Sequence, residues 1–495
     1  MSGDNLSSKQ PAPPRIACVA TAAGHAGGAA IAMERLAAGL RASGAAVDVV
    51  VRDDCGPPGA ATRRLDRGVR RAVRDGRTPV SNTLFTADWP AWDLATHPAV
   101  AAADLVNVHW VAGFVAAAGI RRLVEAGHSV AWTLHDMRPF TGGCHYSAGC
   151  RGFTARCAAC PQLVPALHEL PARSLARARR RLAGIPLRFV SPSRWLADEL
   201  ACSSIFDARW HEVRVIPNGL DLTRFCPGER AGARRRLGLP AEGLGILLGS
   251  VSLAERRKGS DVAVAAVARA TAAVAARSPG RPRPFVITYG SGRLEIPGVA
   301  CHALGSVAEA GVLEATHACD VHLTLTREDN LPNTVMEALA CGRPVLATRT
   351  GGIPEMVCDG VEGWLVDVDD AAAAATMIER LAAEPGLVVA AGRRARDRAE
   401  REWDARLQAR RYLDLAAEQW MPHPTRATAR GHSLDRSLAP HLDRPPTNGP
   451  LSPAVAAIVH RGSPLRGPLR VLRRLAARTA RGRATLRPRL EEARP

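Results

Sequence analysis

The residues most able to do chemistry lie in one loop and at the start of the helix that follows it. The acids Glu328 and Asp329 open the loop, Asn330 and Asn333 are predicted to cap the helix, and Glu337 falls on its first turns. The free N–H groups of a helix start attract phosphate. A carboxylate one turn inside accepts hydrogen bonds from the hydroxyls of a ribose. The arrangement predicts a sugar-nucleotide site, although an ordinary capped helix would explain any one of these features.

A lysine supplies a second candidate group. The chain has 66 lysines and arginines together, but only Lys9 and Lys258 are lysines, so arginine is used wherever any cation is sufficient. Lys258 follows an apolar strand predicted at 245–251 and precedes a helix predicted to begin near residue 260. A compact ammonium at such a junction favours a diphosphate site, with Arg257 beside it as a second cation. Chance retention of one lysine is the alternative.

Two histidines end predicted strands. His109 closes the strand at 105–109, and His135 follows the strand at 129–134. Because the carboxyl ends of parallel strands face the ligand crevice, both are candidates for a site. Asp136 either pairs with His135 or caps the following turn. Ordinary core or surface histidines are the alternative.

Four of the twelve cysteines are clustered. They have the spacing C-x5-C-x6-C-x2-C and are Cys144, Cys150, Cys157 and Cys160. Four thiolates suit a closed, structural zinc site. An iron–sulfur cluster would require redox chemistry that nothing else indicates, and disulfides or free thiols remain alternatives. The other cysteines are scattered, as reduced thiols would be.

Two blocks of alternating strands and helices must position these groups. The first opens with a strand, a glycine-rich turn, a helix and a strand, at 15–21, 24–28, 29–40 and 46–52. Gly27 and Gly28 in that turn allow close approach of a ligand. The second block runs from about residue 229 to 405. The pattern predicts an α/β protein with two doubly wound, Rossmann-like domains facing a cleft.

The charge is concentrated at the C-terminus. The net charge is +19, and the residues from 421 onward carry 15 arginines against 4 acids, or +11. No aromatic residue follows Trp420, which disfavours nucleic acid as a partner. Arginines alternate with leucines at helical spacing across 465–486, which predicts either a basic amphipathic helix on an anionic membrane or arginine-rich low-complexity sequence.

Hydropathy sets the expected location. No run of 18 apolar residues lacks a charge, so no transmembrane span is expected. The polar N-terminus lacks the apolar core of a secretory signal. The expectation is a cytoplasmic protein, with peripheral contact at the inner face of the membrane as an option for the tail.

Several strings resemble retaining glycosyltransferase family 4, whose donor-site signature is E-x7-E and whose fold is GT-B. They are A-L-A-C-G-R-P-V-L-A-T, G-G-I-P-E, G-G-A-A-I-A-M-E-R-L and the pair Lys258-Gly259. The chain departs from the signature at one point, because seven intervening residues before Glu337 lead back to Asp329 rather than Glu328. D-M-R-P-F-T-G-G-C-H-Y with C-P-Q-L resembles a subset of the family that carries this insert beside the acceptor site, with a structural role.

The resemblance implies roles for the candidates. The first acid would touch the donor sugar, Glu337 would hold the nucleotide ribose, and Lys258 would hold the diphosphate. His135 would lie by the donor sugar and the acceptor, with His109 and Asp136 on the acceptor side. The expected catalytic residues are His135, Asp329 and Glu337. The expected donor-binding residues are Gly27, Gly28, Arg257, Lys258, Glu328, Asn330, Asn333, Thr334 and Glu337.

The expected domains follow from the blocks and the resemblance. The first segment is a disordered N-terminus at 1–14. An acceptor domain at 15–225, with the cysteine insert at 141–163, is followed by a donor domain at 226–405. A helix at 406–421 returns to the first domain, and a disordered Arg/Pro-rich tail follows at 422–495. A charged helix is predicted across 394–420, with Trp403, Leu407, Tyr412 and Leu415 at roughly helical spacing.

The expected function is a retaining, hexosyltransferase-type transfer. A sugar would pass from a nucleotide diphosphate to a hydroxyl of a saccharide or lipid-linked acceptor, in polysaccharide or glycoconjugate biosynthesis. No cofactor is expected for catalysis. A nucleotide-sugar epimerase on the same fold is one alternative. The other is a basic membrane- or nucleic-acid-binding protein with an inactive transferase body. A pyridoxal phosphorylase is disfavoured, because Lys258 is already assigned.

Overall fold

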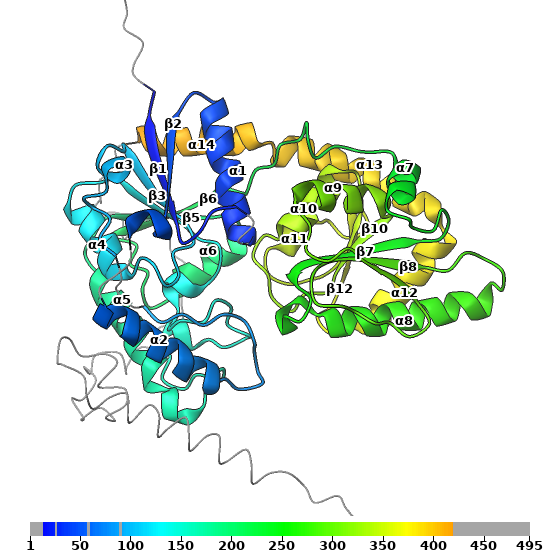
Figure 1. Cartoon of the computed structure of the whole chain (residues 1–495), viewed down its shortest axis with the longest axis horizontal. Coiled ribbons are helices and arrows are strands. Elements are labelled where there is room, and N and C mark those ends of the chain that lie inside the picture. The colour runs from blue at the N-terminus through cyan, green and yellow to red at the C-terminus, as the bar shows by residue number, and fades with distance from the viewer. Residues whose placement is uncertain (1–12, 25–26, 57–59, 89–91, 419–495) are drawn as a thin grey trace, which may run out of the picture.

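The computed structural model describes residues 13–24, 27–56, 60–88 and 92–418. These residues form two α/β domains that lie side by side (Figure 1). Each domain is built on a six-stranded sheet in which every recorded pairing is parallel. The predicted tail at 422–495 lies outside the described residues, as does nearly all of the predicted N-terminal segment at 1–14.

The first domain has the strand order β2-β1-β3-β4-β5-β6. Its strands are β1 Arg15–Ala20, β2 Ala46–Val51, β3 Leu105–Val108, β4 Val130–Thr133, β5 Leu187–Ser191 and β6 His211–Val215. The sequence direction across the sheet reverses between β1 and β3, so a crevice is expected where their carboxyl ends meet. The glycine turn follows β1, and His109 follows β3.

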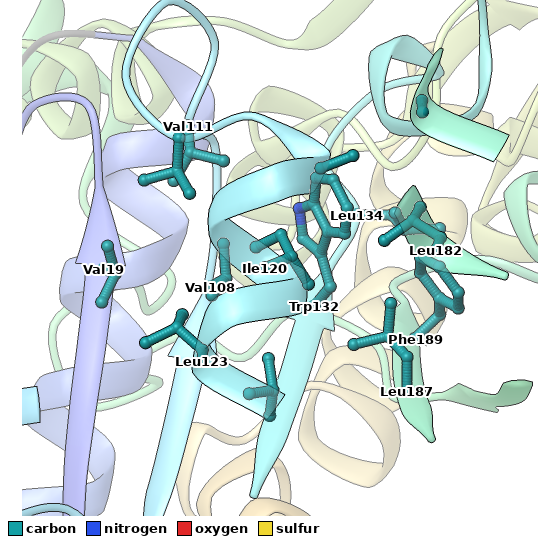
Figure 2. Packing of buried hydrophobic residues seen from close by; sticks show 14 of the residues in the cluster. Val19, Val108, Val111, Ile120, Leu123, Trp132, Leu134, Leu182, Leu187 and Phe189 are labelled. Carbon is teal, nitrogen blue, oxygen red and sulfur yellow. The ribbon is translucent and has the colours of Figure 1, made fainter. Parts of the chain in front are cut away.

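Helices cover both faces of this sheet. They are α1 Gly28–Ala42, α2 Ala60–Asp75, α3 Pro98–Ala101, α4 Ala117–Glu125, α5 Glu169–Leu182 and α6 Arg194–Ala201. Strands β3, β4 and β5 are buried along their whole length, as expected for a sheet covered on two sides. Figure 2 shows part of this core, where Trp132 stacks on Phe189 and lies near Ile120.

The second domain has the strand order β12-β11-β10-β7-β8-β9. Its strands are β7 Gly245–Ser252, β8 Phe285–Ser291, β9 Ala300–Ala303, β10 Val321–Thr324, β11 Val345–Thr348 and β12 Gly363–Val366. Its helices are α7 Arg230–Arg236, α8 Ser260–Arg277, α9 Glu309–Ala318, α10 Asn333–Ala340, α11 Ile353–Met356 and α12 Ala371–Ala383. This is the dinucleotide-fold order 3-2-1-4-5-6, with its switch point between β7 and β10.

The predicted single helix across 394–420 is wrong. The structure has α13 Pro385–Glu402 and α14 Ala405–Ala417, separated by the buried Trp403 and by Asp404. Trp403 is the C-cap of α13. Asp404 caps the start of α14, because its carboxylate accepts a hydrogen bond from the Arg406 N–H. The break lets α14 return to the first domain, where it lies against α1 (Figure 1) and Tyr412 Oη is 2.8 Å from Thr133 Oγ1.

One described stretch, Arg256–Arg277, is long and apolar enough to cross a membrane by length and composition, which the sequence analysis did not expect. It contains α8. Val262, Ala266 and Ala270 on this helix are buried in the core of the second domain. Packing in that core explains why the buried residues of this helix are apolar.

Candidate active site

The candidate groups gather where β7 and β10 end. Lys258 lies on a single turn of 3₁₀ helix, Arg256–Lys258, that follows β7. Gly259 ends this turn with a left-handed φ of 66°, and an added Cβ there would lie 1.8 Å from the Leu325 carbonyl oxygen. Only glycine allows the two loops to approach this closely. The approach brings Lys258 beside the loop after β10.

Asp329 is the acid that faces Lys258. Its Oδ2 is 2.7 Å from Lys258 Nζ and 3.1 Å from Arg257 Nη1, and its Oδ1 accepts a hydrogen bond from Tyr146 Oη at 3.2 Å. Burial alone would raise the pKa of Asp329, but the two cations hold it well below its ordinary value. Asp329 is therefore ionised and tightly held at neutral pH.

Glu328 points to the other domain instead. Its carboxylate accepts hydrogen bonds from the N–H and hydroxyl of Ser147 and from the N–H of Ala148, at 3.2, 3.0 and 2.8 Å. Burial raises the pKa of Glu328, and these hydrogen bonds oppose the rise. Of the two acids that the sequence left open, Asp329 is the one beside Lys258, and Glu328 joins the domains.

Tyr146 completes this cluster, and the sequence analysis missed it. The guanidinium of Arg257 lies 4.0 Å from the centre of the Tyr146 ring, and Arg257 also donates to the Glu328 carbonyl at 2.7 Å. The chain contains only three tyrosines. The scarcity that identified Lys258 could therefore have identified Tyr146 too.

Glu337 lies one turn inside α10 and is 5% exposed. Its Oε1 accepts a hydrogen bond at 2.8 Å from Arg35, which projects from α1 of the first domain and also meets Glu309 at 3.0 Å. Burial raises the pKa of Glu337, and Arg35 opposes the rise. Arg35 was missed as a site residue, although it lies in the A-M-E-R-L string that carried the family resemblance.

The predicted capping role of the asparagines is wrong. Helix α10 begins at Asn333 after Pro332, and no side chain caps it within the described part of the chain. Asn330 instead accepts from Ser193 Oγ at 2.6 Å, and the Asn333 amide donates to the Gly28 carbonyl at 3.0 Å. Both side chains therefore form hydrogen bonds with the first domain rather than with the backbone at the start of their own helix.

The contact at Gly28 brings the starts of two helices together. Gly27 and Gly28 lead into α1, and Asn333 begins α10. Thr334 follows on the first turn of α10 and is half-buried. The N-termini of α1 and α10, one from each domain, therefore approach each other at the cleft, and both dipoles favour an anion there.

The G-G-I-P-E string contains the one-turn helix α11. Gly351 before it has a left-handed φ of 58°, and an added Cβ would lie 1.7 Å from the Asp329 carbonyl oxygen. The Glu355 carboxylate accepts from the N–H groups of Arg194 and Trp195, both at 2.8 Å, at the start of α6. The string therefore supports the donor loop and binds the first domain.

The two histidines do come together. His109 Nδ1 and His135 Nε2 are 3.0 Å apart, and His109 is buried while His135 is half-buried. Burial lowers the pKa of His135 to about 4, against the opposing effect of Asp136. Burial and the neighbouring His135 lower the pKa of His109 well below its ordinary value. Both imidazoles are neutral at pH 7.

Asp136 caps a turn, as one of the two expectations had it, and does not pair with His135. Its Oδ1 accepts from the Arg138 N–H at 2.9 Å, while its Oδ2 lies 2.6 Å from His145 Nδ1 and 2.7 Å from Trp110 Nε1. Burial would raise the pKa of Asp136, but His145 and the other donors hold it below its ordinary value. His145 and Trp110 were missed, although His145 lies in the quoted G-G-C-H-Y string.

The four clustered cysteines line one small void in the first domain, of about 20 Å³. All four are free thiols. Within the described residues, no three His, Cys, Asp or Glu side chains are gathered so that they could hold a metal as placed.

Family models match both domains. Residues 26–224 match "Glycosyltransferase Family 4", and residues 245–384 match "Glycosyl transferases group 1". The first match covers Gly27, Gly28 and the cysteine insert. The second covers Lys258, the donor loop and α10.

Curated relatives agree with these models. The chain is 34% identical over 225 residues to a D-inositol 3-phosphate glycosyltransferase of Saccharomonospora viridis, covering 41% of this chain and 49% of that protein. A second, from Acidothermus cellulolyticus, is 28% identical over 389 residues, which are 74% of this chain and 80% of that protein. The first match therefore spans about half the length of the relative.

Solved structures share the fold. Sucrose-phosphate synthase of Thermosynechococcus elongatus has a TM-score of 0.53 at 19% identity, over 81% of this chain and 98% of that one. WaaG, a glycosyltransferase involved in lipopolysaccharide biosynthesis, has a TM-score of 0.54 at 14% identity, over 81% and 99%. At such identities the likeness shows the GT-B fold alone.

Proposed function

We propose that this chain, which carries a Glycosyltransferase Family 4 domain followed by a Glycosyl transferases group 1 domain on the GT-B fold, transfers a sugar from a nucleotide diphosphate to an acceptor hydroxyl. One observation carries the proposal. Lys258 and Arg257 lie at the switch point of the second sheet, beside the start of a helix that holds the buried Glu337. Cations, helix N–H groups and a fixed carboxylate are what a nucleotide diphosphate requires.

The diphosphate is the leaving group in this reaction. Lys258, Arg257 and the N–H groups of α10 are positioned to stabilise the negative charge that it gains as the glycosidic bond breaks. This arrangement supplies electrostatic stabilisation from the chain's own groups. Glu337 holds the ribose in the proposal, so ribose hydroxyls share or replace its present bond to Arg35.

We propose retention of configuration without a covalent sugar–enzyme intermediate. A carboxylate held by two cations, as Asp329 is, is a weak nucleophile but a good electrostatic partner for a positively charged sugar. Glu328 is occupied by three hydrogen bonds to the first domain. The family resemblance of the donor loop supports a hexosyl donor.

The acceptor enters, in this proposal, from the first domain. A cavity of about 590 Å³ lies beside α2, with Arg67, Arg70, Val69 and Trp92 in its lining. Thr86 also lines it and lies 3.1 Å from His145 Nε2, so the cavity adjoins the Asp136–His145 network. Cations and apolar groups together suit an acceptor with a sugar or phosphate part and an apolar part, which favours a saccharide or lipid-linked acceptor.

The proposed setting is the cytoplasm. All twelve cysteines are free thiols, which supports a reducing compartment. The proposed role in polysaccharide or glycoconjugate synthesis rests on the same family resemblance.

A donor panel tests the proposal. The full chain is incubated with UDP-, GDP- and ADP-linked sugars, and release of nucleoside diphosphate is measured with and without saccharide acceptors. We expect turnover with one donor class, and a loss of at least about tenfold in kcat/KM for Lys258→Arg, because a planar guanidinium does not replace a compact ammonium. Arg269→Lys, on the exposed side of α8, is the matched control.

Three outcomes oppose the proposal. One is the absence of turnover with any donor. Another is conversion of the donor to an isomeric nucleotide sugar with no diphosphate released, which indicates an epimerase. The third is equal activity of Lys258→Arg and the wild type.

A further inference from the structure

The cysteine insert is a long segment with little regular structure. Between residues 141 and 163 it contains only one 3₁₀ turn, Gly152–Thr154. Such a segment needs another source of order, because loops of this length rarely hold one conformation by themselves. Its first and last cysteines, Cys144 and Cys160, are buried, and the two between them are half-buried.

The sulfur-bearing side chains face a shared space. The void of about 20 Å³ is lined by all four cysteines together with Phe85, Phe153 and Pro171. A space of this size holds one water molecule or one ion. Four soft thiols and an apolar wall exclude water and favour a soft, tetrahedral cation.

One backbone N–H group points at a sulfur of the cluster, because the Gly152 N–H donates to Cys150 Sγ at 3.3 Å. Donors of this kind stabilise negatively charged sulfur, which is the form that binds a metal.

The backbone of the insert is strained where it turns around the void. Three non-glycine residues in the described chain have positive φ, and two of them, Ala148 and Cys157, lie here with φ of 51° each. Such strain persists only where the surroundings enforce it.

The segment between the first two cysteines touches the proposed donor site. Tyr146 donates to Asp329, and Ser147 and Ala148 donate to Glu328. These three consecutive residues begin two positions after Cys144 and end two positions before Cys150. Whatever fixes these cysteines therefore also fixes the contact of the insert with the donor loop.

We propose that the four cysteines bind one zinc ion, and that this ion orders residues 144–150 against the donor loop. The thiols turn inward on their single side-chain torsions to reach the ligand distance of about 2.3 Å. Each thiol releases its proton to solvent on binding, and the binding free energy offsets the backbone strain. The kinetic consequence rests on the proposed transferase function, whereas the metal site does not.

Metal binding is tested on the intact wild-type chain. Elemental analysis after purification without chelator is expected to give about one zinc per chain. Titration of the reduced, metal-free chain with Co²⁺ is expected to give the visible absorption of tetrahedral cobalt–thiolate, displaced by one equivalent of Zn²⁺. A chain without zinc whose four thiols react freely, and which gives no such spectrum, overturns the proposal.

A variant pair tests the link to the donor loop. Cys157→Ser with Cys160→Ser is expected to lose the metal, to raise the donor KM by about tenfold or more with a smaller change in kcat, and to increase hydrogen exchange at 144–150. Cys202→Ser, an exposed cysteine outside the cluster, is the control and should retain the metal. Metal loss with unchanged donor KM and unchanged exchange overturns the ordering role. Absence of all transfer in the zinc-loaded wild type would instead count against the proposed function.

Discussion

Single residues at this site are held by charges from distant parts of the chain. Asp329 is stabilised by Lys258 and Arg257 from the same domain and by Tyr146 from the other. Glu337 is held by Arg35 alone among the charged partners recorded for it. Its ionised form is therefore stabilised less, and burial keeps its pKa raised.

Glu337→Gln tests the ribose role. The amide keeps the shape of the side chain but loses the charge-assisted hydrogen bonds, so we expect kcat/KM to fall by an amount corresponding to about 2–4 kcal/mol. Folding should be retained. The control is Glu309→Gln, because Glu309 also contacts Arg35 but lies on α9. Steady-state kinetics with varied donor measure both; equal losses in the two variants would assign the effect to Arg35 instead.

The pair of His109 and His135 predicts a pH dependence of stability. The pKa of His135 falls from its ordinary value to about 4 on folding. The unfolded chain therefore binds more protons between about pH 4 and 6.5, so the free energy of unfolding should rise with pH across that window. Full stabilisation is reached above pH 6.5 and is lost as the pH falls toward 4.

Urea unfolding of wild type and His135→Gln between pH 4.5 and 7 measures the contribution of His135 to the pH dependence of the free energy of unfolding. We expect the pH-dependent part to shrink by on the order of 1–3 kcal/mol in the variant. The buried His322, whose pKa burial also lowers to about 4, remains in both chains and serves as an internal reference. Parallel pH profiles for the two chains would show that His135 is not buried as a neutral group.

At the scale of elements, strand ends and helix starts produce the site. Both sheets turn the carboxyl ends of their strands to the cleft, and α1 and α10 begin there. The two loops after β7 and β10 meet because Gly259 removes the side chain at their closest approach. The element scale therefore sets where Lys258 and Asp329 can meet.

Gly259→Ala tests whether the close approach of the two loops costs more than the strain of a positive φ alone. Its φ of 66° costs an alanine about 1–2 kcal/mol, and the clash with the Leu325 carbonyl adds to that. Gly238→Ala is the matched control, because its φ is 64° and nothing lies within 4 Å of the added Cβ. We expect Gly238→Ala to lose only the conformational cost and Gly259→Ala to lose more stability together with donor binding. Thermal unfolding and donor affinity measure the pair, and equal losses would contradict the account.

At the scale of the whole molecule, acids of the second domain hold the N–H groups of the first. Glu328 binds Ser147 and Ala148, and Glu355 binds the start of α6. Helix α14, which follows the second domain in the chain, packs against the first domain and so also connects the two domains. Charge-assisted hydrogen bonds therefore hold the two domains together.

The prediction for the tail, which lies beyond the described residues, rests only on its charge. Removing residues 422–495 takes away all of the +11 carried from residue 421 onward, because residue 421 is an uncharged methionine. We expect transfer to a soluble acceptor to be unchanged, and binding to anionic vesicles to fall because that charge attracts anionic lipid. Vesicle co-sedimentation and acceptor kinetics compare the two chains, with neutral vesicles as the control. Equal binding to anionic vesicles would leave the tail without a membrane role.

The sequence by itself determined the groups and the framework. Strand and helix periodicity follows from local spacing, so the two Rossmann-like domains, the position of Lys258 after β7 and that of Glu337 within α10 were predictable. The family models and the structural neighbours confirm the GT-B fold. Only the tertiary structure decided the partners. Arg35 and Glu337 are 302 residues apart, and Tyr146 and Asp329 are 183 apart.

No local pattern encodes such distances. Asn330 and Asn333 were predicted to cap a helix, and His135 was one predicted partner of Asp136. Both predictions followed from near neighbours, because a sequence pattern shows only residues that are close along the chain. In the folded chain Asn330 and Asn333 bond to the first domain, and Asp136 bonds to His145 within its own domain. Buried polar groups gain more by such pairing than groups near solvent.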